Sequence, residues 1–180
     1  MTAQPSKPAP SDQAPTLILQ PERPQDGPQI DALIERAFGP GRYAKVSERV
    51  REFAQFAPEL SVCAWSPGPS GEERLLGCAR MWRVRVGGAP IAFLGPFAVE
   101  EGERSAGFGA RMIARACEAA AAAGETHVLL VGDEAYFGRV GFANAPARRI
   151  VMPGPVDPKR VLVRALTSDA AELAGPVRPV

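Results

Sequence analysis

Two long strand-like segments joined by a pair of glycines constrain the fold of this chain most strongly. Residues 74–86 are RLLGCARMWRVRV and residues 89–99 are APIAFLGPFAV, with Gly87 and Gly88 between them. Glycine adopts positive φ at little cost, and the two-residue turn of a β-hairpin requires such angles. Arginine and valine alternate over residues 83–86, which is typical of a strand with one face in water. The sequence therefore predicts a long antiparallel hairpin.

The dipeptide Gly95-Pro96 interrupts the second of these strands. Proline cannot donate a hydrogen bond to a neighbouring strand, so within sheets it is found at bulges and edges. We therefore expect a bulge or a splayed edge within residues 89–99.

A helix and a strongly apolar strand are predicted after the hairpin. Residues 107–124 are rich in alanine and have a helical pattern that Gly124 ends, and residues 127–133 are HVLLVGD. A strand that is apolar along its whole length is typical of parallel pairing after a helical crossover. The sequence thus predicts one βαβ unit next to the antiparallel hairpin.

Shorter elements surround this centre. Strands are predicted at residues 16–20, 60–65, 140–146 and 160–166, and helices after Asp26, from Ser47 and over residues 134–139. Asp26 and Ser47 have side chains that commonly cap helix N-termini. The predicted fold class is α/β (α+β), with the element order βααβββαβαββ and a mixed, mostly antiparallel sheet. We expect one folded domain at residues 16–167, a proline-rich disordered tail at 1–15 and a loose C-terminal tail at 168–180.

The composition argues against several classes of partner. The chain has 180 residues, 46% of them hydrophobic, and a formal net charge of +1, so no electrostatic case exists for binding nucleic acid. No apolar run approaches the roughly 20 residues of a membrane-spanning helix, and the N-terminus lacks the apolar core of a secretory signal. The three cysteines show no metal-ligand spacing, and His127 is the one histidine. We therefore expect no metal site, no membrane partner and a reducing, cytoplasmic setting.

A glycine-rich turn at residues 101–114, EEGERSAGFGARMI, has the character of an anion site. The turn follows a strand and begins a helix, so its backbone N–H groups and the positive end of the helix dipole face one point. Small residues allow a phosphate to reach such amides, and Arg104 adds a positive charge. The alternative is that the glycines serve only close packing of the helix on the sheet.

Two familiar phosphate-binding designs fit this turn poorly. A P-loop requires Gly-Lys-Ser/Thr at the helix start, and the turn contains no lysine. A dinucleotide-binding fold would use Gly107 and Gly109, with Asp133 near the expected position of the ribose carboxylate. However, Met112 stands where the third glycine belongs, and hairpins rather than parallel repeats precede the turn. The dinucleotide alternative stays as the more distant one.

The third design is specific, because RSAGFG at 104–109 resembles the Arg/Gln-x-x-Gly-x-Gly/Ala signature of the GNAT superfamily of N-acetyltransferases. Residues 94–142, from LGPFAVEEGERSAGFGARMI to VLLVGDEAYFGRVGF, are similar to a bacterial subgroup predicted to be such enzymes. The resemblance implies two central strands that splay after a bulge, with the pantetheine arm of the coenzyme in the gap. It also implies a set of coenzyme-binding residues, with backbone amides for the pyrophosphate and strand backbone for pantetheine: Arg104, Ser105, Ala106, Gly107, Phe108, Gly109, Ala110, Phe97 and Val99.

The catalytic groups are less well defined by the resemblance. The usual acid of the family is a tyrosine, but its position here is occupied by Phe137, with Tyr136 adjacent. Tyr136 is therefore the candidate acid, with a half-buried structural tyrosine as the alternative. Val99 is the expected N–H donor to the carbonyl oxygen.

Other side chains have two open interpretations each. Asp133 and Glu134 are either candidate bases or caps of the following helix, and His127 is expected to be structural. The acceptor side could be lined by a further set, whose members could equally be core or solvated residues: Arg42, Tyr43, Arg80 and Trp82.

The resemblance thus implies an acetyl-CoA-dependent N-acetyltransferase that acts by direct transfer on a primary amine, in a small molecule or a peptide. An amine must lose its ammonium proton before it can attack, which requires a base or a chain of waters. The alternative from another class is a non-catalytic acyl-CoA-binding module or sensor. The oligomeric state, a homodimer included, stays open.

Overall fold

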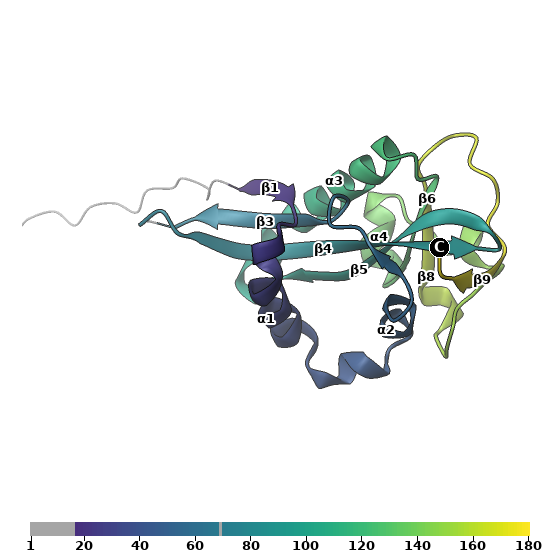
Figure 1. Ribbon diagram of the computed structural model, residues 1–180, viewed down its shortest axis with the longest axis horizontal. Helices are drawn as coiled ribbons and strands as arrows, with labels where there is room; N and C mark the ends of the chain where they lie inside the picture. The colour runs from purple at the N-terminus through teal and green to yellow at the C-terminus, as the bar shows by residue number, and fades with distance from the viewer. Residues whose placement is uncertain (1–16, 69) are drawn as a thin grey trace, which may run out of the picture.

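The computed structural model describes residues 17–68 and 70–180, and the hairpin forms its centre (Figure 1). Strands β4 (Glu73–Val86) and β5 (Ala89–Val99) pair antiparallel from Val86↔Ala89 onward. Gly87 and Gly88 have φ of 56° and 100°, so both adopt the positive angles that the turn needs. The hairpin prediction is confirmed, whereas the predicted disordered tail at 1–15 lies outside the described residues.

The other strands extend the sheet on both sides of the hairpin. The main path is β1-β3-β4-β5-β6-β8, and β2 and β9 also pair with β4. Within the described residues, parallel pairing occurs between β5 and β6 and between β7 and β9, and every other pair is antiparallel. These strands are β1 (Ile18–Pro21), β2 (Gln55–Phe56), β3 (Val62–Pro67), β6 (His127–Val131), β7 (Ile150–Val151), β8 (Val161–Ala165) and β9 (Gly175–Arg178). The predicted fold class is correct, and a repeated parallel arrangement for a dinucleotide is absent from the described chain.

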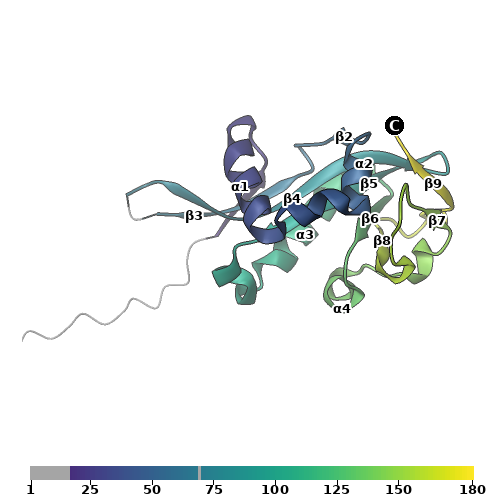
Figure 2. The ribbon, with the colours of Figure 1, turned by 90° about the horizontal axis from the view of Figure 1, so that it is seen from below.

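Helices cover both faces of the sheet (Figures 1 and 2). Side chains of a strand alternate between faces, and along β3 Cys63 packs under α1 whereas Ala64 packs under α3. The helices are α1 (Gly27–Phe38), α2 (Val46–Arg51), α3 (Phe108–Ala122) and α4 (Glu134–Phe137). Short 3-10 turns join them, of which η2 (Pro40–Ala44), η3 (Glu101–Ala106), η4 (Gly138–Val140) and η6 (Pro158–Arg160) bear on the site.

The two predicted helix caps are wrong in detail. The Asp26 carboxylate accepts the backbone N–H of Arg23 at 2.9 Å and makes no capping bond to α1. Helix α2 begins at Val46, so Ser47 lies in its first turn rather than at its cap. Asp26 is the residue before α1, as predicted, but it also ends the 3-10 turn Pro24–Asp26, and its carboxylate bonds back to Arg23.

A bulge at Gly95-Pro96 separates β5 from β6 beyond the middle of the sheet. Between Met81↔Leu94 and Ala79↔Phe97, β5 contains one residue more than β4 does. The indole N–H of Trp82 donates to the Gly95 carbonyl oxygen at 2.6 Å, which satisfies a group that the bulge takes out of the ladder. The predicted bulge is therefore confirmed.

The C-terminal segment is better ordered than its sequence predicts. We expected a loose tail over residues 168–180, but β9 pairs with β4 through Arg85↔Arg178 and Val86↔Val177. Leu173 and Val177 are buried. The reason is that β3 pairs with β4 only as far as Ala79, which leaves an open edge for later segments. The predicted strand over 140–146 is reduced to a single bridge, Ala143↔Val163.

Candidate active site

The backbone of β5 beyond the bulge has a free edge. Within the described residues, β6 pairs with β5 only at Ala92↔Val128 and Phe93↔Leu129, although β5 continues to Val99. The Glu100 N–H donates to the Leu76 carbonyl at 2.8 Å, toward β4. Backbone groups of successive strand residues point to opposite edges, so those of Val99 and Phe97 point into the space that β6 has left. An extended ligand could pair with this edge as a further strand would.

The start of α3 presents backbone N–H groups at one end of that edge. Gly107 is the N-cap residue with φ of 73° and has no side chain to bond the first amides of the helix. An added Cβ on Gly107 would meet nothing within 4 Å. The first N–H groups of a helix have no partners inside it, so those of Phe108 to Arg111 require partners from elsewhere. Ser105 and Ala106 belong to η3, immediately before this turn.

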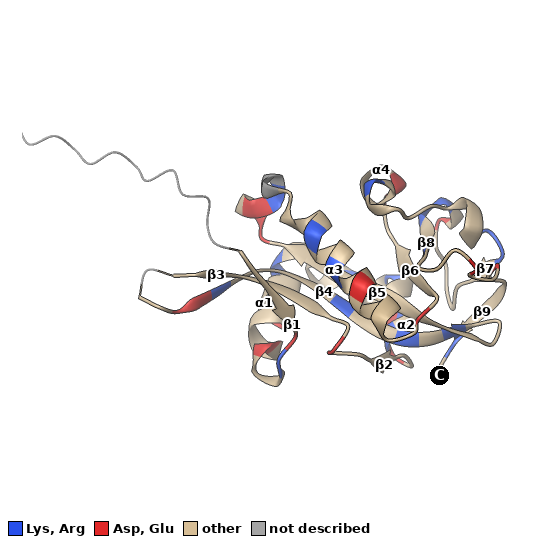
Figure 3. Ribbon diagram, turned by 90° about the horizontal axis from the view of Figure 1, so that it is seen from above, with Lys and Arg blue, Asp and Glu red and all other residues tan. Residues whose placement is uncertain are grey.

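Charges around this turn favour an anion. Arg104 and Arg111 are exposed, and basic positions lie along α3 in Figure 3. The nearby carboxylate of Glu103 is paired with Arg74 at 2.7 Å, and that of Glu100 is paired with Arg36. These two acids therefore have cationic partners, and Arg104 and Arg111 outnumber Glu101, the other exposed acid of the turn, so the local charge balance is positive.

Gly109 has a different role from Gly107. An added Cβ there would lie 2.7 Å from the Tyr136 hydroxyl, 3.1 Å from Phe97 Cζ and 3.6 Å from Val99 Cγ2. The packing interpretation therefore applies to Gly109, which allows close contact with Tyr136 and Phe97. The anion-site interpretation suits Gly107, which supplies a positive φ next to open space.

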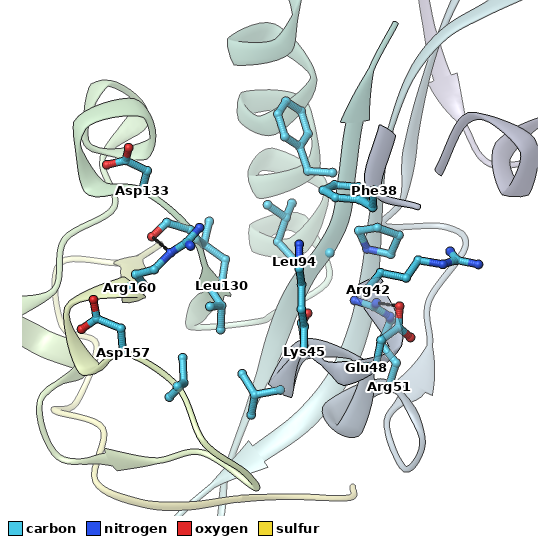
Figure 4. Close-up of a pocket in the computed structure, with 18 of the residues that line it drawn as sticks. Phe38, Arg42, Lys45, Glu48, Arg51, Leu94, Leu130, Asp133, Asp157 and Arg160 are labelled. Carbon is cyan, nitrogen blue, oxygen red and sulfur yellow. Dashed lines mark hydrogen bonds and ion pairs between the residues drawn. The ribbon is translucent and has the colours of Figure 1, made fainter. Parts of the chain in front are cut away.

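A cavity of about 660 Å³ lies at the other end of the free edge, between the splayed strands and the α1–α2 segment (Figure 4). The β5 side contributes residues 94–97, and the β6 side contributes residues 130–133. Phe97 lines this cavity, but Val99 does not, because Val99 lies farther along β5 beside Gly109. The free edge of β5 therefore runs from the start of α3 to the cavity.

Tyr136 and Phe137 both line the cavity, and the Tyr136 hydroxyl also lies beside Gly109 of α3. Their ring centroids are 6.1 and 5.9 Å from that of Phe97, although adjacent residues of a regular helix point about 100° apart. Helix α4 is a single turn that continues into η4, and this irregularity allows both rings to lie near Phe97. The Phe137 ring packs edge-on against Phe142, whereas Tyr136 is 42% exposed. Burial raises the pKa of Tyr136, so its phenol is protonated at neutral pH.

The acidic candidates have local hydrogen bonds. Asp133 caps α4 by accepting the Ala135 N–H at 2.9 Å, and Glu134 accepts the Asn144 N–H at 2.9 Å. Asp133 also lines the cavity, so it combines a capping role with access to a ligand. His127 is buried at the far end of β6, away from this cavity, where burial lowers its pKa.

Of the residues expected on the acceptor side, Arg42 lines the cavity, whereas Tyr43, Arg80 and Trp82 do not. Arg42 lines the cavity, but its guanidinium donates to the Tyr43 hydroxyl at 2.6 Å and points away from the space in Figure 4. Tyr43 is 63% exposed. Arg80 pairs with Glu22 at 2.8 Å and Trp82 supports the bulge, and neither lines the cavity.

The sequence reasoning missed most charged residues of the cavity. From α2 and the residue before it come Lys45, Glu48 and Arg51, and from the η6 region come Asp157 and Arg160. Glu48 and Arg51 are three residues apart and therefore share a helix face, which was the one available signal. Nothing local in the sequence indicates that residues 40–51 meet residues 155–160.

A metal centre and a membrane-spanning helix are both absent from the described residues. Among the described residues, no group of three or more His, Cys, Asp or Glu side chains is arranged to hold a metal ion. In the same part of the chain, no helix has the length and apolarity needed to cross a membrane.

The chain is similar to known acetyltransferases in sequence and structure. The sequence profile described as "Acetyltransferase (GNAT) family" matches residues 29–143. The uncharacterised N-acetyltransferase YhbS of Escherichia coli strain K12 is 26% identical over 156 residues, which are 86% of this chain and 90% of YhbS. The crystal structure of Escherichia coli YhbS with CoA has a TM-score of 0.72 and covers 93% of this chain and 91% of that one. A GNAT family acetyltransferase from Brucella melitensis with acetyl-CoA is 25% identical, with a TM-score of 0.64 over 92% of this chain and 96% of that one.

Proposed function

The chain belongs to the acetyltransferase (GNAT) family, and we propose that it transfers the acetyl group of acetyl-CoA directly to a primary amine. The observation that carries the proposal is the continuous path from the start of α3, along the free edge of β5, to the cavity. A long ligand with an anionic group at one end and a reactive group at the other fits such a path.

The residues of this path suit the parts of coenzyme A. The N–H groups at the start of α3 and the exposed Arg104 would hold the pyrophosphate, because a helix N-terminus without a capping side chain favours anions. The backbone of Phe97 and Val99 would pair with the amides of pantetheine. Both YhbS of Escherichia coli and the Brucella melitensis protein were crystallised with this coenzyme or its acetyl form, which supports the assignment.

The N–H of Phe97 is the better candidate to polarise the carbonyl of the acetyl group. The sequence favoured Val99 for this role, but Phe97 lines the cavity and Val99 does not. A fixed backbone donor stabilises negative charge on the oxygen without moving during the reaction. Acetyl-CoA, when bound, supplies the acetyl group as a thioester, and this chain supplies its position and the proton transfers.

Tyr136 and Asp133 are the proposed proton-transfer groups. Tyr136 is protonated at neutral pH and lies beside the coenzyme path, so it can donate to the departing sulfur. Asp133 lines the cavity and can take the ammonium proton, directly or through water, with the carboxylate oxygen that the cap leaves free.

Two measurements test the proposal. Calorimetric titration with acetyl-CoA should give binding, and release of free coenzyme A thiol should accelerate when an accepted amine is added. If no binding is detected at millimolar acetyl-CoA, the proposal is wrong. Tight binding without thiol release from a broad amine panel would instead favour the acyl-CoA sensor, which Phe137 at the usual acid position makes the second candidate.

A further inference from the structure

The charged residues of the cavity differ in how well their charges are balanced. Arg51 pairs with Glu48 on α2, and their side chains are only 11% and 17% exposed. These two charges therefore offset each other. Arg42 pairs with Glu35 at 3.5 Å and contacts Tyr43. These three charged residues of the wall thus already have partners.

Lys45 and Arg160 are the cations without such a partner. Within residues 17–68 and 70–180, no carboxylate oxygen lies within 4.0 Å of either side-chain nitrogen group. The Lys45 ammonium lies 5.2 Å from the Phe38 ring centroid, and Arg160 Nε donates to the Gly132 carbonyl at 3.4 Å. Figure 4 shows Lys45 reaching into the space from the α2 side and Arg160 facing it from the other side.

Opposite α2, the carboxylates of Asp133 and Asp157 each use one oxygen in a local hydrogen bond. Asp133 accepts the Ala135 N–H and Asp157 accepts the Lys159 N–H, each through Oδ1. Their second oxygens face no cation within 4 Å in the described chain. Asp133 adjoins the end of β6, where the splayed strands open, so it lies on the side from which the coenzyme path enters.

Apolar side chains lie between these charges. Leu94 and Leu130 line the middle of the cavity in Figure 4, with Phe38 beside Leu94. Such a surface suits a short hydrocarbon stem and gives a polar one no hydrogen bonds.

We propose that the acceptor is a compact amino acid-type molecule, in which a short apolar stem joins a primary amine to a carboxylate. This inference rests on the proposed function. Lys45 and Arg160 bind the carboxylate, and Asp133 faces the ammonium near the coenzyme path. A diamine would bring a second ammonium toward Lys45 and Arg160, which are two cations against the one carboxylate of Asp157, so like charges disfavour polyamines.

Matched acceptors test the inference, with thiol release as the assay. One series is γ-aminobutyrate, γ-aminobutyramide and 1,4-diaminobutane, and the other is ε-aminocaproate, ε-aminocaproamide and hexamethylenediamine. Members of a series share the amine and the stem and differ at the charged end. In at least one series, kcat/KM should be about tenfold or more higher for the carboxylate than for the amide, because hydrogen bonds between charged groups are the stronger ones.

Three variants assign that preference to the proposed residues. Lys45→Met and Arg160→Gln should each lower kcat/KM for the carboxylate about tenfold and leave the amide's value unchanged. Lys159→Met is the matched control, because Lys159 is exposed in η6 next to Arg160 and does not line the cavity. It should keep the preference, and thermal melts should show that all three variants are folded.

The possible failures are distinguishable. If amines are acetylated but amides or diamines match the carboxylates, the inference is wrong and the proposed function stands. The same holds if the preference survives in both cavity variants, or is lost equally in Lys159→Met. If acetyl-CoA does not bind, or binds without any turnover, the proposed function fails and the inference fails with it.

Discussion

Replacing Gly107 by alanine separates the two roles proposed for the glycine-rich turn. At φ of 73° an L-residue pays about 1–2 kcal/mol. Alanine also lowers the conformational entropy of the unfolded chain, which stabilises the fold by about 0.4–1 kcal/mol. Because the new methyl group would meet nothing within 4 Å, no clash adds to this. We therefore expect the free energy of unfolding to fall by only about 1 kcal/mol.

The same methyl group should weaken coenzyme binding far more than it weakens the fold. It stands beside the first amides of α3, where a phosphate must approach to accept their N–H groups. Loss of one hydrogen bond to a charged group is worth about 1.5–3 kcal/mol, which is about 10- to 150-fold in Kd. Calorimetric titration with acetyl-CoA measures this change, and urea denaturation measures the cost in stability.

Two further alanine variants act as controls for Gly107→Ala. Gly102 is exposed, has no neighbour within 4 Å of an added Cβ and has no positive φ, so Gly102→Ala should bind acetyl-CoA normally. Gly109→Ala gains about 1 kcal/mol of helix propensity but crowds the Tyr136 hydroxyl, so its effect is on packing. Unchanged Kd in folded Gly107→Ala would refute the assignment of the turn to the pyrophosphate.

Three other predictions concern the bulge, the acid and the buried histidine. Trp82→Phe removes the donor to the Gly95 carbonyl and should lower the free energy of unfolding by about 1–3 kcal/mol; an unchanged urea midpoint would show that water replaces the indole. Tyr136→Phe should lower kcat about 10²–10⁴-fold with little change in acetyl-CoA affinity, and Phe137→Tyr should give no gain; a silent Tyr136→Phe would exclude it as the acid. Burial lowers the pKa of His127 in the folded chain, whereas the unfolded value is about 6.5. Between these two pKa values the unfolded chain binds more protons than the folded chain, so the free energy of unfolding should fall as pH decreases below about 6.5. In His127→Gln, the free energy of unfolding should fall less over the same pH range.

Features encoded by neighbouring residues were predictable from the sequence. The Gly87-Gly88 turn and the Gly95-Pro96 bulge follow from the backbone chemistry of two residues each. The parallel strand β6 follows from an apolar run after a helical segment. These elements fix the central sheet and the free edge of β5, so the fold class and the general position of the site could be predicted.

Features that depend on distant segments were not predictable. Strand β9 forms because β4 is longer than its partner β3, and residues 175–178 contain no signal for that vacant edge. Lys45 and Arg160 are far apart in the sequence, and neither has a motif around it. The choice between Tyr136 and Phe137 depended on the irregularity of a single helical turn, which no periodicity can reveal.

The two ends of the path from the α3 turn to the cavity are built by different stretches of the chain. Residues 95–111 hold the free edge of β5 and the turn before α3, whereas much of the opposite end comes from residues 38–51 and 155–160. Substitutions in the second group can therefore accumulate without disturbing the first. Over evolutionary time, a lineage with this architecture can exchange one acceptor for another while its use of the acyl donor stays constant. The same separation makes residues 38–51 the natural region to randomise in a library that seeks new acceptors.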